Sequence, residues 1–77
     1  MPHATQAFHV YAAHDGRTHG HTIEGESPED AAIAFVEAWH PAADADGDVQ
    51  VFVREEGSGR EQCFRIDLSS GDTQPCG

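Results

Sequence analysis

The segment between residues 27 and 41 constrains the fold more than any other part of the sequence. Ser27 is a preferred helix N-cap residue and Pro28 is favoured at the first helical position, and two acidic residues follow in the first turn. Behind this start, apolar residues recur on one helical face, at Ala31, Ala32, Phe35, Val36 and Trp39. Pro41 cannot continue a helix, so the helix is predicted to end near Trp39. The segment therefore predicts one amphipathic helix with a single apolar face to bury.

Four segments of alternating apolar and polar residues flank this helix. They predict strands at residues 8–13, 18–24, 49–54 and 63–68. The turn residues His14-Asp15-Gly16 predict a three-residue hairpin loop between the first two strands, and a glycine-containing connection at residues 55–60 joins the last two. A further turn at residues 69–72 allows residues 73–76 to add a short edge strand.

The element order ββαββ predicts an α+β domain, in which one antiparallel sheet of four or five strands carries the helix on one face. The chain is expected to form a single domain, residues 1–77, with flexible ends at residues 1–7 and 75–77. The buried layer is expected to consist of Phe8, Val10, Val49, Val51, Val53, Phe64, Ile66 and Leu68 from the sheet and Ala32, Phe35, Val36 and Trp39 from the helix. Because one helix covers only one face, the other face of the sheet is expected to be open.

The charge of the chain limits its partners. Four arginines, no lysine and 14 carboxylates give a formal net charge of −10 at pH 7. That sign disfavours binding to the phosphates of nucleic acids and to anionic membranes, and no apolar run approaches the ~20 residues of a membrane helix. The first residues lack the pattern of a signal peptide, so a cytoplasmic location is expected. The acidity indicates either a solvated surface or a face that binds a basic partner or imitates nucleic acid.

The two cysteines, Cys63 and Cys76, are too few for a disulfide framework and form no CxxC motif. In a reducing cytosol, Cys63 is expected to be a small buried apolar residue and Cys76 an exposed thiol near the end of the chain. A bridge between them is the alternative, and it requires the end of the chain to fold back.

The open face of the sheet carries the residues that we expect to make contacts, which are Tyr11, Phe52 and Arg65. By the alternation of their strands, Tyr11 and Phe52 are aromatic residues on an otherwise polar face. A homodimer that pairs these faces, or that pairs edge strands, would bury them; alternatively, neighbouring side chains shield them. In RNA-binding sheets such aromatic residues lie among basic residues, of which this acidic chain has few. We therefore expect a protein partner or a second copy rather than nucleic acid.

Three histidines are candidate metal ligands. A three-residue hairpin loop places His9 opposite His21, about 5 Å apart at Cβ, with His19 on the same face. Three imidazoles match the ligand number of a catalytic zinc site, so zinc is the one cofactor that the sequence suggests. A two-residue turn at Asp15-Gly16 would instead shift the register by one and turn His19 and His21 to the other face. Solvent-exposed strand histidines are the alternative.

Other chemical motifs are incomplete. The spacing of ligands in an EF-hand calcium loop is matched by Asp44, Asp46, Asp48 and Glu55. However, Val49 occupies the position that requires glycine, and the residues after it predict a strand rather than a helix. The sequence contains no nucleophile-elbow, P-loop or dinucleotide-binding motif. We therefore expect no enzymatic activity and no catalytic residue.

Two stretches carry a resemblance to known families. The sequences TIEGESPEDAAIAFVEAW at residues 22–39 and GREQCFRIDLSSGDTQPCG at residues 59–77 resemble a family of short acidic bacterial domains of unknown function, over about residues 8–76. That resemblance implies no activity, ligand or catalytic residue. Residues 22–39 are also similar to HicB-like antitoxin domains, which by analogy implies an inhibitor of a partner protein.

Together these observations predict a small cytoplasmic protein-interaction module that is homodimeric and has no catalytic activity. The first alternative is a metal-binding protein that uses the strand histidines. The second is an acidic inhibitor or nucleic-acid mimic that binds a basic partner.

Overall fold

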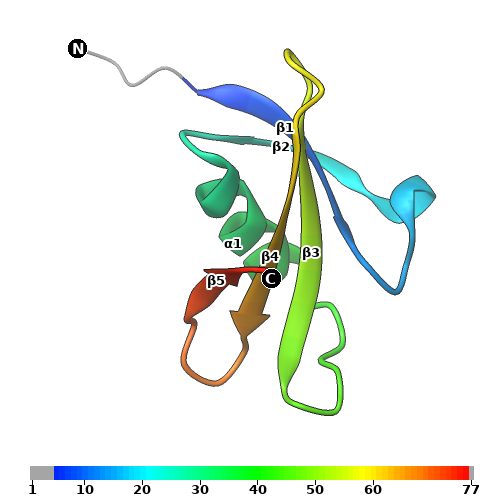
Figure 1. Ribbon diagram of the computed structural model, residues 1–77, viewed down its shortest axis with the longest axis vertical. Helices are drawn as coiled ribbons and strands as arrows, with labels where there is room; N and C mark the ends of the chain where they lie inside the picture. The colour runs from blue at the N-terminus through cyan, green and yellow to red at the C-terminus, as the bar shows by residue number, and fades with distance from the viewer. Residues whose placement is uncertain (1–4, 77) are drawn as a thin grey trace.

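A computed structural model describes residues 5–76 of the chain, apart from the side chain of Arg17. Its elements are β1 (Gln6–Ala12), the 3-10 helix η1 (Arg17–His19), β2 (His21–Gly25), α1 (Pro28–Trp39), β3 (Asp48–Glu55), β4 (Glu61–Asp67) and β5 (Thr73–Pro75). The five strands form one antiparallel sheet in the order β2-β1-β3-β4-β5, and α1 lies against one face of it (Figure 1). This arrangement confirms the predicted fold class, including the short fifth strand.

Helix α1 begins and ends where the sequence predicts. Ser27 has an extended backbone (φ −149°), and its Oγ accepts a hydrogen bond from the Asp30 backbone N–H at 3.2 Å. At the other end His40 adopts the left-handed conformation (φ 46°), and its N–H donates to the Val36 carbonyl at 2.9 Å. Pro41 then prevents a further turn.

The apolar side chains of the strands and of α1 meet in one core. Its fully buried large side chains are Phe8, Val10, Val49, Val51 and Val53. From the helix, Ala31, Ala32 and Phe35 are buried against them. Since Val36 packs at the edge of this cluster, the predicted buried layer is confirmed for ten of its members, but not for Leu68 and Trp39.

Leu68 and Trp39 were predicted in the core, and both are exposed instead. Leu68 is 42% exposed because β4 ends at Asp67, so the side chain belongs to the turn that leaves the sheet. Trp39 is 48% exposed because it lies in the last turn of α1, where the imidazole of His21 stacks on its ring at a centroid distance of 4.1 Å. The apolar positions predicted from the sequence therefore extend beyond the residues that are actually buried in the core.

The predicted loop between the first two strands is wrong. The chain bends at Gly16 (φ 80°) and then forms η1, so β2 begins at His21 rather than near Thr18. The register consequently pairs His9 with Thr22 and Val10 with His21. Tyr11 lies beyond the β1–β2 ladder and pairs with Phe52 of β3. The three-residue loop fails because the turn continues into a 3-10 helix, in which the His19 N–H donates to the Gly16 carbonyl at 3.2 Å.

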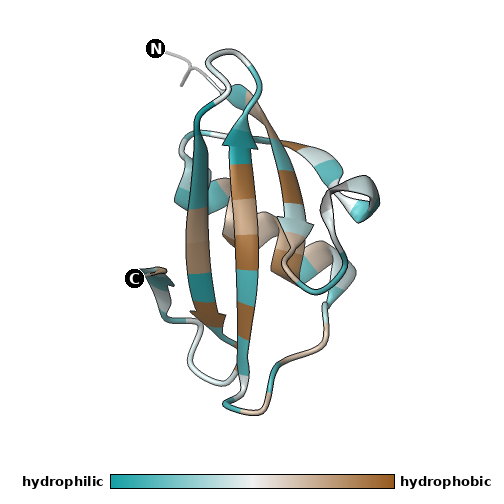
Figure 2. Ribbon diagram, turned by 45° about the vertical axis from the view of Figure 1, so that its right-hand side comes forward, coloured by the Kyte–Doolittle hydropathy of each residue, from teal (hydrophilic) through white to brown (hydrophobic). Residues whose placement is uncertain are grey.

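The face of the sheet opposite α1 is open in the described part of the chain. Figure 2 shows this face, with hydropathy alternating along the strands and the helix behind them.

The sequence predicted flexible ends at residues 1–7 and 75–77. Residues 1–4 and 77 lie outside the described residues. Of the others, Gln6 and Ala7 begin β1, and β5 extends to Pro75. Among the described residues, no helix combines the length and the apolar content needed to cross a bilayer.

Candidate functional site

The open face is the surface formed by the strand residues that point away from α1. By strand register these are Ala7, His9, Tyr11, Thr22, Glu24, Asp48, Gln50, Phe52, Arg54, Glu61, Cys63, Arg65, Asp67 and Gln74. All three residues expected to make contacts, Tyr11, Phe52 and Arg65, therefore lie on one face, as the alternation predicts.

Tyr11 and Phe52 form an aromatic pair at the centre of the open face. They are direct partners across β1 and β3, and their rings stack at a centroid distance of 5.3 Å. The Tyr11 hydroxyl donates to Glu61 Oε1 at 3.4 Å. As a result Tyr11 is only 8% exposed, whereas Phe52 is partly exposed. Shielding by neighbouring side chains, one of the two alternatives for this pair, therefore applies to Tyr11, whereas Phe52 stays partly exposed.

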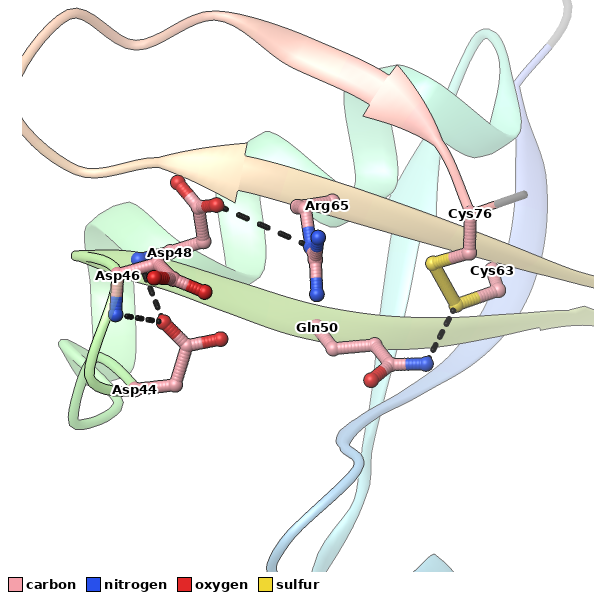
Figure 3. A network of polar contacts seen from close by, with 7 residues as sticks. All are labelled: Asp44, Asp46, Asp48, Gln50, Cys63, Arg65 and Cys76. Atoms are coloured by element: carbon pink, nitrogen blue, oxygen red, sulfur yellow. Dashed lines mark hydrogen bonds and ion pairs between the residues drawn. A yellow bond between two sulfur atoms is a disulfide. The ribbon is translucent and has the colours of Figure 1, made fainter.

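Arg65 lies in a row of polar side chains that follows β3 and β4 (Figure 3). Its Nε is 3.8 Å from Asp48 Oδ2, and about half of its side chain is exposed (51%). Its direct strand partners are Gln50 and Gln74, two amide side chains that sequence reasoning did not select. A cleft of about 270 Å³ lies beside them and is lined by Gln50, Arg65, Gln74, Pro75 and Cys76. Arg65 is therefore a surface cation in a polar setting.

Cys63 and Cys76 form a disulfide, with a Cα–Cα distance of 5.2 Å, so the prediction of two free thiols is wrong. Strand β5 folds back along β4, and the Cys76 N–H donates to the Cys63 carbonyl at 3.0 Å, which brings the two residues opposite each other. Gln50 Nε2 donates to Cys63 Sγ at 3.3 Å (Figure 3). A signal was present in the sequence: the two cysteines are equally distant from the centre of the Ser69-Ser70 turn, as paired residues of a hairpin are.

The three candidate metal-ligating histidines are not brought together. His9 lies on the open face, whereas His21 pairs with Val10 and lies on the helix side against Trp39 and Phe35. His19 is exposed in η1. The predicted pairing of His9 with His21 is wrong because the longer connection shifts the register by one residue. Among residues 5–76, no three His, Cys, Asp or Glu side chains are placed to share a metal ion.

The acidic segment before β3 forms a backbone turn. Asp44 Oδ1 accepts hydrogen bonds from the backbone N–H groups of Asp46 at 2.9 Å and Asp48 at 3.1 Å. Gly47 supplies the positive φ of 84° that this turn requires. Val49, 2% exposed, then enters the core as part of β3. The segment therefore leads into a strand, whereas the calcium loop of an EF-hand leads into a helix. This agrees with the sequence argument against an EF-hand.

The turn after β4 contains a carboxylate with a perturbed pKa. Ser69 donates to Asp67 Oδ1 from its hydroxyl at 2.7 Å and from its backbone N–H at 2.9 Å. Both bonds favour the ionised form and lower the pKa of Asp67. A lowered folded-state pKa contributes stability above the unfolded pKa, about 3.9, and that contribution is lost as pH falls through the folded value.

Replacing Ser69 by alanine is expected to raise the pKa of Asp67, because it removes the hydroxyl donor that acts most strongly on this carboxylate. The acid sensitivity of the protein below about pH 4 should then become weaker. NMR titration of the Asp67 carboxyl carbon between acidic and neutral pH measures this. Ser58→Ala is the control, since Ser58 Oγ accepts from the Arg60 N–H in a different turn. An unchanged Asp67 pKa in Ser69→Ala would show that the hydroxyl does not contribute.

Comparison with known proteins adds a family assignment. No curated protein and no solved structure matches the chain. The model of a family of unknown function, DUF5961, matches residues 6–77, which include both of the sequence stretches that carried the resemblance. The chain therefore belongs to DUF5961, a family of unknown function.

Proposed function

We propose that the protein is a small interaction module without catalytic activity, which forms a homodimer by pairing the open faces of two copies. The observation that carries the proposal is the partly exposed Phe52 stacked on Tyr11, at the centre of a sheet face that no described element covers. An aromatic centre with a polar rim is the usual composition of a specific protein interface. Phe52 would supply the buried centre, and Arg65 would lie at the rim.

The distribution of charge favours a second copy as the occupant of the open face. This face carries both signs: Arg54 faces Glu61 across the β3–β4 ladder, and Arg65 pairs with Asp48. Helix α1, by contrast, contains acidic residues and no Lys or Arg. Pairing the open faces would place the two acidic helices on the outside of the dimer, which limits repulsion between two chains of charge −10.

The absence of catalysis is also part of the proposal. It is supported by the burial pattern, since no polar or charged side chain is buried among the described residues. Acid–base catalysis at neutral pH usually depends on a buried group whose pKa is shifted toward 7. The pKa of Asp67 is lowered by its bonds to Ser69, whereas a carboxylate that acts as a general base near neutral pH has a raised pKa.

Binding of a basic protein is the second candidate function. The exposed acidic residues of α1, Glu29 and Glu37, favour it, together with the net charge. Such binding should weaken steeply with salt, whereas pairing through the open face should not. Zinc binding by His9, His19 and His21 is a third candidate. Histidine is a common zinc ligand, but the geometry of the described residues does not support a shared site.

The proposed cytoplasmic location has to account for the disulfide. Disulfides persist in oxidising compartments and are usually reduced in the cytosol. In a cytoplasmic protein the Cys63–Cys76 pair would therefore be a dithiol for most of the time. Alkylation of cells with a thiol-trapping reagent before lysis would measure which form is present.

Sedimentation equilibrium of the untagged protein tests the homodimer. At tens of micromolar we expect a mass twice that of the 8.3 kDa chain, unchanged between low and moderate salt. Phe52→Gln should reduce the mass to that of a monomer. Trp39→Gln is the matched control, because Trp39 is an exposed aromatic residue on the helix side and its substitution should leave the dimer intact.

A wild-type monomer at these concentrations would contradict the proposal. So would a dimer that Phe52→Gln leaves intact and Trp39→Gln dissociates, since that result would place the interface on the helix side. A monomer that gains stoichiometric mass with zinc would favour the histidines instead.

A further inference from the structure

We propose that the Cys63–Cys76 disulfide is a redox-operated latch on one edge of the sheet. When it is closed, it holds β5 over the outer edge of β4. When a dithiol reductant opens it, β5 detaches and the outer edge of β4 is left unpaired, while the rest of the sheet stays folded. This inference is independent of the proposed homodimer.

The attachment of β5 is weak apart from the disulfide. Strand β5 has three residues, lies at the edge of the sheet and pairs with β4 alone in the described sheet. By the alternation of the ladder, only Gln74 of its three residues directs its backbone N–H and C=O groups toward β4, because Thr73 and Pro75 occupy the positions on either side of it. The connection from β4 is the exposed turn at residues 68–72, which is closed by the Gly71 N–H to the Asp67 carbonyl. A three-residue strand of this kind is marginal by itself, because ordering its backbone costs more free energy than a few exposed hydrogen bonds recover.

The disulfide lies where it can control this attachment. It closes a loop of residues 63–76, which contains most of β4, the turn and β5, so it links β5 to β4 and does not cross-link β1, β2 or β3. Both cysteines are partly exposed, and Cys76 lies at the rim of the cleft beside Arg65. An external thiolate can therefore reach the bond without unfolding of the core.

The chemical step is thiol–disulfide exchange with a dithiol. A thiolate of the reductant attacks Cys76 Sγ, the S–S bond breaks, and its electron pair leaves on Cys63 Sγ as a thiolate. The amide N–H of Gln50, which already donates to Cys63 Sγ at 3.3 Å, would stabilise that charge. The second thiol of the reductant then displaces Cys76 and forms the oxidised, cyclic disulfide. Both protein thiolates take up a proton, so two electrons pass from the dithiol to the protein.

The alternation of backbone hydrogen bonds along β4 provides an internal control. The Asp67 N–H donates to the Asp72 carbonyl, and the register places the Arg65 N–H against Gln74 in the same way. On the other side of β4, the Glu55 N–H donates to the Arg60 carbonyl, so the register directs the intervening amides of Phe64 and Ile66 toward β3. Neighbouring amides of one strand thus report separately on β5 and on the central sheet.

Residue-resolved amide hydrogen exchange of the full chain, with and without dithiothreitol, tests the latch. On reduction, we expect the amides of Arg65 and Asp67 to exchange at least tenfold faster relative to those of Phe64 and Ile66. The double variant Cys63→Ser, Cys76→Ser should show the same pattern without reductant, which separates the effect of the bond from that of the reagent.

Two results would overturn the latch. If Arg65 and Asp67 keep their protection in the reduced protein, β5 stays attached without the disulfide. If Phe64 and Ile66 lose protection to the same degree, the disulfide supports the whole fold rather than its edge. Monomer concentrations can be used throughout, so failure of the homodimer proposal does not affect either outcome.

Discussion

Substitution of Phe8 by alanine is expected to lower the free energy of unfolding by about 3–5 kcal/mol, the largest loss of any single truncation in this sheet. Phe8 is fully buried in β1, between β2 and β3 and on the face that α1 covers. Alanine leaves a cavity there in addition to the lost transfer free energy. A domain of this size has a total stability of roughly 4–12 kcal/mol, so the variant should be close to unfolding.

Phe52→Ala is the matched control, because it removes the same side chain from a partly exposed position on the open face. Its cost should be below about 1.5 kcal/mol when both variants are compared by urea unfolding at low micromolar concentration. If Phe52→Ala destabilises as much as Phe8→Ala, the assignment of the two sheet faces is wrong.

Substitution of Gly20 by alanine should destabilise the protein by about 1–3 kcal/mol, through overpacking. A Cβ at this position would lie 2.5 Å from His9 Nε2 and 2.9 Å from the Val10 carbonyl oxygen. The histidine side chain can rotate away, but the Val10 oxygen belongs to the backbone of β1 and cannot move without disturbing the centre of the sheet. Thermal unfolding followed by circular dichroism measures the loss as a lower Tm.

Gly57→Ala provides the comparison for Gly20→Ala. A Cβ at Gly57 meets no atom within 4 Å, so its Tm should stay within a degree or two of the wild type. The second variant His9→Ala, Gly20→Ala should recover only part of the loss, because the contact with the Val10 oxygen persists. A Gly20→Ala protein as stable as Gly57→Ala would contradict the close approach of the chain at this point.

For the candidate site on the open face, the sequence predicted which residues share the face but not which of them are exposed. Alternation alone placed Tyr11, Phe52 and Arg65 on one face, because successive side chains of a strand point to opposite sides. It left open whether the two aromatic residues are exposed or shielded, since the shielding of Tyr11 comes from Phe52 and from Glu61, which lies 50 residues away in sequence. The exposure of a side chain depends on such neighbours from other strands. The sequence of its own strand does not show which neighbours these are.

The sequence by itself determined α1 and the core side of each strand. Ser27, Pro28 and Pro41 act through local backbone geometry, and the period of the apolar residues is a local property of each segment. These features involve residues within a few positions of one another, so their physical causes can be read from the chain.

Only the tertiary structure decided the β1–β2 register, the exposure of Trp39 and the pairing of Cys63 with Cys76. A register is set by the length of the connection, and here η1 lengthened it and moved His21 to the side opposite His9. The disulfide forms because β5 folds back along β4, which depends on hydrogen bonds between strands rather than on the spacing of the cysteines alone. Each of these outcomes depends on contacts between segments that are distant or joined by irregular turns, and local residue preferences do not specify such contacts.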